Sequence, residues 1–129
     1  MDVWPGLAVL AESGCRYVVV GSAARALAGH MMGKFGPRDL DIVVADTDDD
    51  RARVAAALAR IGGRMVVGGR RREVAAFAGS TWAVVTPYGP VDVFFRFADG
   101  SDYFGHRRAA WLVPIGGIAV RCHPMRHAA

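Results

Sequence analysis

The chain has 129 residues, of which 53% are hydrophobic and 22% are charged, a composition that predicts one globular domain over residues 1–129 and excludes a disordered chain. All of its 16 basic residues except Lys34 are arginine, and the net charge is +4. This mild basic excess permits a nucleotide or nucleic-acid partner but does not demand one.

Helix and strand signals alternate through the first half of the chain. Apolar periodicity, β-branched runs and glycine stops predict a helix over 4–13, a strand over 15–20, a helix over 22–30, a loop over 31–38, a strand over 39–44 and a helix over 51–63. Ser22 is the candidate N-cap of the second helix. Asp46, Asp48, Asp49 and Asp50 precede the third helix and complement its dipole, so we expect them to be capping and solvated residues rather than a metal cluster.

The second half of the chain is predicted to be mostly β-structure. The signals are strand candidates over 64–67 and 73–79 around a loop over 68–72, a hairpin of 80–86 and 91–97 around the turn 87–90, a short helix over 101–111, and a closing hairpin over 112–122. Together the elements predict an α/β domain with a mixed β-sheet and helices packed on it. Early strands would be joined by helical crossovers, and later strands would be antiparallel.

The cysteines and the N-terminal segment bear on the cellular compartment. Cys15 and Cys122 adjoin apolar runs, which predicts buried free thiols in a reducing cytoplasm. Asp2, Pro5 and Glu12 interrupt the apolar N-terminus, so no signal peptide is expected. No apolar run reaches the roughly 18 residues that a spanning helix needs, so no membrane partner is expected.

Two aspartates mark the strand over 39–44. Asp39 and Asp41 share one face of this strand because side chains alternate, and their Cα atoms would lie about 6.5–7 Å apart. Without a cation the pair would repel and resist burial, whereas two carboxylates at this separation can converge on one divalent cation or on two. Two ordinary acidic residues at a strand edge are the alternative for this motif taken alone.

A third aspartate lies in the apolar strand VDVFF. Solvation does not explain Asp92 well there, because Val91, Val93 and Phe95 occupy the opposite face. If this strand neighbours the strand over 39–44, three carboxylates meet on one face. They would hold two Mg²⁺ ions and leave Asp92 able to assist deprotonation of an incoming hydroxyl.

The segment VVVGSAAR ends a strand and begins a helix. Gly21 lets a ligand approach the backbone, and Ser22 can donate its hydroxyl to a phosphate at the helix N-terminus. Arg25 lies three residues further on, on the same helical face. A simple helix cap is the alternative for this segment taken alone.

The order of these motifs resembles the nucleotidyltransferase fold of the DNA polymerase β superfamily. GSAAR is similar to the GSxARG of minimal bacterial nucleotidyltransferases, with Ala26 where the last glycine would stand. The longer segment 18–44 resembles the abortive-infection (AbiEii-like) toxin nucleotidyltransferases, whose pattern has a Gly-Gly-x-Ala start and a longer loop before DIDL. The resemblance covers the core motifs over 15–97 and, more loosely, the closing hairpin.

The resemblance implies a polymerase β palm-like fold and a Mg²⁺-dependent reaction. A nucleoside monophosphate would pass from an NTP to a hydroxyl, with release of pyrophosphate. Asp39 and Asp41 would hold the metals, and Asp92 would be the third ligand and the base.

The resemblance also implies phosphate-binding residues. Gly21 and Ser22 would hold the β and γ phosphates, with Arg25 as a further candidate. Lys34 and Arg38 lie on the loop before the acidic pair, where they could neutralise charge on the triphosphate.

The acceptor expected from this resemblance is RNA or a protein, in a toxin-type enzyme that acts with a cognate partner protein or as a homo-oligomer. Family members usually continue after the closing hairpin into helices, whereas this sequence stops at Ala129. Three explanations are open: another protomer or partner supplies the missing part, the acceptor is a macromolecule, or catalysis is vestigial. The alternative functions are an antibiotic-type small-molecule nucleotidyltransferase and a non-catalytic module that binds a nucleotide or a partner.

The remaining polar motifs have simpler interpretations. The C-H-x₃-H spacing over 122–127 offers three ligands, one short of a structural zinc site. His30 and His106 are expected at helix ends or on the surface. The arginine-rich segment 68–72 is expected to be a solvated loop, with contact to nucleic-acid phosphates as the alternative.

Overall fold

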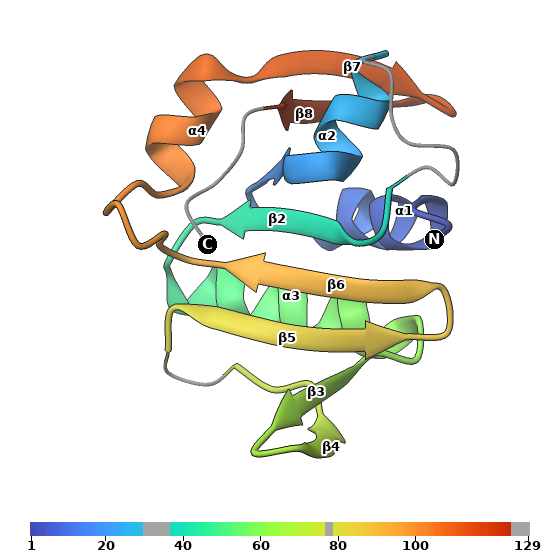
Figure 1. Ribbon diagram of the computed structural model, residues 1–129, viewed down its shortest axis with the longest axis vertical. Coiled ribbons are helices and arrows are strands. Elements are labelled where there is room, and N and C mark those ends of the chain that lie inside the picture. The colour runs from blue at the N-terminus through green and yellow to red at the C-terminus, as the bar shows by residue number, and fades with distance from the viewer. Residues whose placement is uncertain (30–36, 77–78, 125–129) are drawn as a thin grey trace.

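A single mixed sheet organises the computed structural model, which describes residues 1–29, 37–76 and 79–124 (Figure 1). In this part of the chain the sheet has eight strands, in the order β4-β3-β5-β6-β2-β1-β8-β7. The strands are β1 (Tyr17–Val20), β2 (Leu40–Val44), β3 (Arg64–Val67), β4 (Arg70–Glu73), β5 (Thr81–Thr86), β6 (Gly89–Phe94), β7 (Trp111–Ile115) and β8 (Ile118–His123). The helices are α1 (Trp4–Ser13), α2 (Gly21–Leu27), α3 (Asp48–Arg60) and α4 (Tyr103–Ala109). The predicted α/β class with a mixed sheet is confirmed.

The strand pairing differs from the expected topology at one point. Helices α2 and α3 connect the early strands as predicted, but β1 and β2 are antiparallel neighbours. The parallel pairs join strands that are distant in sequence: β2 with β6, and β1 with β8. Strand β6 therefore lies between β2 and β5. This position brings the aspartate of β6 beside those of the β2 region.

Strands β3 and β4 form a hairpin where a loop and a later strand were predicted. Gly68 and Gly69 are the two connecting residues, with φ angles of 56° and 75°. Positive φ at both positions gives the hairpin turn whose twist matches the flanking strands. The arginine run Arg70–Glu73 is consequently an exposed edge strand, so the predicted loop over 68–72 is wrong. The strand predicted over 73–79 is wrong for 74–76, which follow the end of β4, and its residues 77–78 lie outside the described part of the chain.

The interpretation of Asp50 as a solvated residue is also wrong, because the side chain is only 5% exposed. It accepts hydrogen bonds from the Arg16 backbone N–H at 2.8 Å, the Arg16 guanidinium at 2.9 Å and the Thr47 hydroxyl at 2.6 Å. Thr47 caps α3 by accepting from the Asp50 N–H. The acidic start of α3 is thus anchored to the residue that precedes β1. The other three aspartates of this segment are exposed, as expected.

Apolar side chains cover both faces of the sheet. Leu40, Ile42 and Val44 pack with residues of α1, α2 and α3, whereas Val43 packs on the opposite face near α4. In Figure 1, α1 and α3 lie behind the sheet, and no helix of the described residues covers the front of β5 and β6. Among the described helices, none combines the length and apolar character needed to cross a bilayer.

His106 is buried rather than at the surface, with 3% exposure. Its ring hydrogen-bonds with Ser101 Oγ at 3.0 Å and with His123 Nδ1 at 2.9 Å, so these contacts join α4 to β8. His30 lies outside the described residues. The expectation of buried free thiols is confirmed, and burial raises the pKa of the Cys122 thiol to about 11.

Candidate active site

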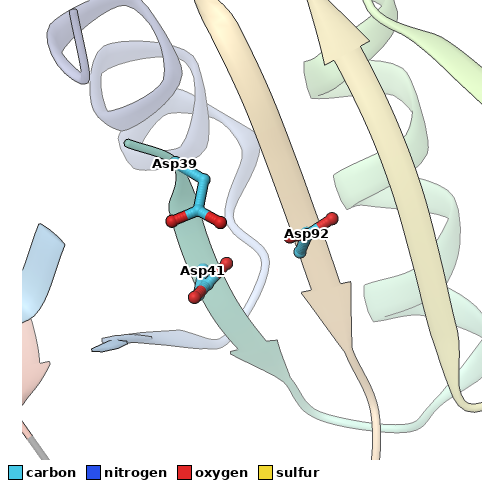
Figure 2. Close-up of side chains that lie close together, drawn as sticks. All are labelled: Asp39, Asp41 and Asp92. Carbon is cyan, nitrogen blue, oxygen red and sulfur yellow. The ribbon is translucent and has the colours of Figure 1, made fainter. Parts of the chain in front are cut away.

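Three carboxylates converge where β2 and β6 run side by side. Asp41 is paired with Asp92 in the parallel register of these strands, and Asp39 lies just before β2. One oxygen from each residue lies within 4.8 Å of the others. Figure 2 shows Asp39 and Asp41 along β2 with Asp92 on the neighbouring strand. The convergence of the three predicted acids is therefore observed, although Asp92 is about 50 residues from the other two in sequence.

The electrostatics of this cluster favour a bound cation. Asp41 is only 6% exposed, and Asp39 and Asp92 are partly buried. Like charges at this separation raise the free energy of the ionised state, and burial raises it further. Carboxylate oxygens are the donors preferred by hard divalent cations such as Mg²⁺. The donor set therefore fits the divalent metal expected from the sequence.

Gly21 contacts this cluster directly. Its φ is +67°, and a Cβ atom added there would lie 2.8 Å from Asp41 Oδ2. A side chain at this position would thus be strained by its backbone conformation and would collide with the carboxylate. Glycine is required here by both effects.

Ser22 has a different local role from the predicted one. Helix α2 begins at Gly21, with Val20 at the N-cap position and no side-chain cap, so Ser22 is not the cap. Its hydroxyl instead donates to Asp39 Oδ1 at 3.4 Å, a long hydrogen bond. The Gly-Ser segment is therefore coupled to the acidic cluster rather than to capping of α2.

The three basic candidates have different placements. Arg25 lies one turn after Ser22, and its Nη1 atom is buried with no hydrogen-bond partner among the described residues. An anion would satisfy such a donor at a lower cost than leaving it unpaired. Arg38 is exposed and directly precedes Asp39. Lys34 lies outside the described residues.

A cavity between two strands was missed in the sequence. Strands β3 and β5 separate beyond the pair of Met65 with Val84 and leave a cavity of about 580 Å³, whose lining includes Trp82 on the sheet face opposite Asp92. Side-chain periodicity shows which face a residue occupies but not where two strands diverge.

Comparison with known proteins identifies the fold. Neither a protein-family model nor a curated protein sequence matches the chain. The chain is similar in structure to TM1012 from Thermotoga maritima, a candidate nucleotidyltransferase, with a TM-score of 0.61 and 14% identity over 95% of this chain and 77% of that chain. It is also similar to the antibiotic-resistance factor ANT(2'')-Ia, with a TM-score of 0.61 and 18% identity over 93% of this chain and 62% of that chain. At these identities the likeness is one of fold, and the predicted nucleotidyltransferase fold is confirmed.

Proposed function

We propose that this chain is a Mg²⁺-dependent nucleotidyltransferase that moves a nucleoside monophosphate from an NTP to a hydroxyl of an RNA or protein acceptor. The proposal depends on one observation above all: three carboxylates lie within 4.8 Å of one another on two neighbouring strands. The fold shared with TM1012 and ANT(2'')-Ia supports it. The proposed unit is a single domain over residues 1–129.

The proposed chemistry assigns a role to each acid. Asp39, Asp41 and Asp92 would hold two Mg²⁺ ions, which when bound neutralise charge on the reacting phosphates. The acceptor oxygen forms a bond to the α-phosphorus, while the bond from that phosphorus to the bridging oxygen breaks and pyrophosphate leaves. Asp92 accepts the proton of the acceptor hydroxyl and later releases it to water. Its position on the open side of the cluster, next to exposed Ala83, suits this role.

The triphosphate would bind at the start of α2. The Gly21 backbone and the Ser22 hydroxyl lie against the acidic cluster, so a phosphate held there would be adjacent to the metals. We assign Arg25, Lys34 and Arg38 to the triphosphate as further positive charges. The buried, unpartnered Nη1 atom of Arg25, as judged within the described residues, supports its assignment.

The proposed biological setting is a toxin of the AbiEii-like type that acts in the cytoplasm with a cognate partner protein or as a homo-oligomer. Its basis is the loop and acidic motif of segment 18–44 together with the buried free thiols. A small-molecule acceptor is the second candidate function, because the antibiotic-resistance factor ANT(2'')-Ia shares the fold. A non-catalytic nucleotide-binding module is the third.

The test is transfer of label from α-labelled NTPs to total RNA and to total protein in the presence of Mg²⁺. Asp41→Asn should abolish transfer, whereas Asp49→Asn, which alters an exposed aspartate at the start of α3, should retain it. Absence of transfer alongside Mg²⁺-dependent NTP binding would favour the non-catalytic module. Absence of both would refute the proposed function.

A further inference from the structure

A pair of histidines joins α4 to the end of β8. His106 of α4 is 3% exposed, and its Nδ1 atom lies 2.9 Å from Nδ1 of His123, the last residue of β8. The other ring nitrogen of His106, Nε2, hydrogen-bonds with Ser101 Oγ at 3.0 Å. The two histidines are titratable groups outside the acidic cluster, and the chemistry proposed above gives neither of them a role.

Strand register places His123 on the same face of the sheet as the carboxylates. Strand β1 lies between β2 and β8, and its last residue, Val20, is paired with Asp41 on one side and with His123 on the other. Asp41 is in turn paired with Asp92. Paired residues of neighbouring strands share a face, so these four residues form one row across the sheet. Tyr103 of α4 packs with Val20 on this face, which agrees with the contact between α4 and His123.

This row has a chemical direction. In phosphoryl transfer the attacking and leaving oxygens lie on opposite sides of the reacting phosphorus. The proposed base, Asp92, is at the β6 end of the row, and no described helix covers the front of β5 and β6 (Figure 1). With the acceptor on that side and the α-phosphate on metals at Asp41, the pyrophosphate leaves toward β1 and β8.

His123 is the titratable residue of the row on this leaving side. It lies two strands from Asp41, which places their Cα atoms about 10 Å apart. Two phosphoryl groups and an imidazole side chain can together bridge that distance. Gly21, already proposed to hold phosphate, directly follows Val20 and therefore lies in the same interval.

The contact with His106 holds one edge of the His123 ring and leaves the other open. Two Nδ1 atoms at 2.9 Å share one proton, because two N–H groups cannot face each other at this distance. When His123 carries a proton on both nitrogens, its Nδ1–H donates to His106 and its Nε2–H remains for a ligand. Nε2 has no hydrogen-bond partner among the residues that the structure describes, and the side chain is partly exposed.

The surroundings of His123 favour a neutral ring until an anion binds. Partial burial lowers the pKa of its imidazole. Its partner on β1, Val20, is apolar. The titratable and charged groups on the other elements around it are mostly cations: His106, Arg107 and Arg108 of α4, Arg121 of β8, Arg25 of α2 and, one strand beyond Val20, Asp41 of β2. A triphosphate beside the ring would reverse this preference, because nearby negative charge stabilises the imidazolium form.

We propose that His123 contacts the triphosphate, with its Nε2–H donating to the β and γ phosphates and then to the leaving pyrophosphate, and that His106 and Ser101 are positioning residues for its ring. This inference rests on the proposed function for the placement of the triphosphate. It assigns His123 to the leaving-group side of the reaction, opposite Asp92. The alternative is a purely structural link between α4 and β8, which would not respond to a nucleotide.

The first experiment measures binding of the Mg²⁺ complexes of ATP, GTP, CTP and UTP by calorimetry, without an acceptor and in buffers of different ionisation enthalpy. At pH 7 the wild-type chain should take up as much as about one proton per NTP bound, because His123 becomes charged. His123→Asn retains an amide near the Nδ1 position but cannot titrate. It should lose this uptake and bind the NTP about tenfold or more weakly, whereas its affinity for the corresponding NMP should be nearly unchanged.

The matched control is Arg107→Gln, which removes an exposed cation from α4 and should follow the wild type in affinity and proton uptake. Circular dichroism of each variant establishes that it is folded. An NTP affinity and a proton uptake that are unchanged in His123→Asn would overturn the proposal. Equal losses in Arg107→Gln would also overturn it, because they would indicate a general effect of charge.

The second experiment follows NTP affinity between pH 6.5 and about 8.5. The wild-type affinity should fall as the pH rises, since the imidazolium is lost, and His123→Asn should lack this fall. Ser101→Ala removes the partner of His106 Nε2 and should lower the affinity while the pH dependence remains, as expected of a positioning residue. A fall of equal steepness in the wild type and His123→Asn would overturn the assignment.

The two levels of inference fail in different ways. Proton-linked NTP binding that depends on His123, without any transfer, would refute the proposed function and leave the phosphate contact standing. Transfer with kcat and KM unchanged in His123→Asn would overturn the role of His123 and leave the nucleotidyltransferase standing. Absence of NTP binding in the wild-type chain would overturn both.

Discussion

Neutralising Asp41 should make the metal-free chain more stable while it abolishes the proposed activity. Asp41→Asn conserves the shape of the side chain and removes one of the three negative charges of the acidic cluster. A purely structural aspartate would give the opposite result, because its loss would lower the free energy of unfolding.

The magnitude follows from the geometry of the cluster. Two unit charges 4.8 Å apart interact by about 3.5 kcal/mol at an effective dielectric constant of about 20 and by about 0.9 kcal/mol in bulk water. Asp41 is buried, but Asp39 and Asp92 are only partly so, and therefore the effective value lies between these limits. Counterions reduce the repulsion further. We expect Asp41→Asn to raise the free energy of unfolding by about 1–3 kcal/mol in the absence of divalent metal.

Added Mg²⁺ should reverse the order of stability, so that the wild-type chain has a larger free energy of unfolding than Asp41→Asn. A ligand that binds only the folded state at 100 times its dissociation constant stabilises that state by about 2.7 kcal/mol. The wild-type chain should gain this increment, and Asp41→Asn should gain little of it. The assay is urea denaturation with EDTA and across a Mg²⁺ titration, with Asp49→Asn as the control that should follow the wild type in both conditions.

Two results would refute this reasoning. One is a loss of stability in Asp41→Asn when EDTA is present, which would mean that the carboxylate is held by structural contacts. The other is a wild-type chain whose stability does not respond to Mg²⁺ or Mn²⁺, which would mean that the three carboxylates do not form a divalent-metal site.

Three further predictions address other parts of the structure. Gly21→Ala should lower the free energy of unfolding by about 1–2 kcal/mol, because the backbone at residue 21 has a positive φ. It should also reduce nucleotide transfer at least 100-fold, because the added Cβ would displace the Asp41 carboxylate. Unchanged transfer in a single-turnover assay would contradict this contact. Asp50→Ala should cost about 2–3 kcal/mol in urea denaturation, since it leaves the Arg16 backbone N–H without its partner. Burial alone would raise the pKa of Asp50, but hydrogen bonds from Arg16 and Thr47 outweigh it and hold the pKa below its usual value. The contribution of Asp50 to the free energy of unfolding is therefore present above about pH 4 and should be lost as the pH falls further. A difference in stability between Asp50→Ala and the wild type that does not change with pH would contradict this. Burial also lowers the pKa of His123, so the unfolded chain binds more protons near pH 6.5 and stability should rise with pH through that range; thermal melts of His123→Gln should lack this rise.

Local structure and residue types were readable from the sequence. The bounds predicted for α1 agree with the structure, and the helices α2 and α3 lie where Ala- and Leu-rich segments predicted them. The spacing of Asp39 and Asp41 was sufficient to place both on one face of a strand, because side-chain direction alternates along any strand. The lone aspartate in an apolar strand was sufficient to single out Asp92.

Errors arose where a residue's environment depends on distant segments. Asp50 looked like a solvated helix-start residue, but it is buried because the residue before β1 donates three of its hydrogen bonds. His106 does lie in the last turn of α4, but it is buried rather than exposed because β8 supplies its partner His123. The β3–β4 hairpin was missed because arginine has no marked strand preference, and the Gly68–Gly69 turn decided the outcome.

The sequence by itself therefore determined the chemistry of this protein: three carboxylates, a glycine-serine segment and an excess of arginine. The tertiary structure decided their arrangement. Only the parallel pairing of β2 with β6 brings Asp92 opposite Asp41, a contact between strands about 50 residues apart in sequence. The reason is physical: the alternation of side chains is local to one strand, whereas the choice of neighbouring strand depends on burying apolar surface from the whole chain.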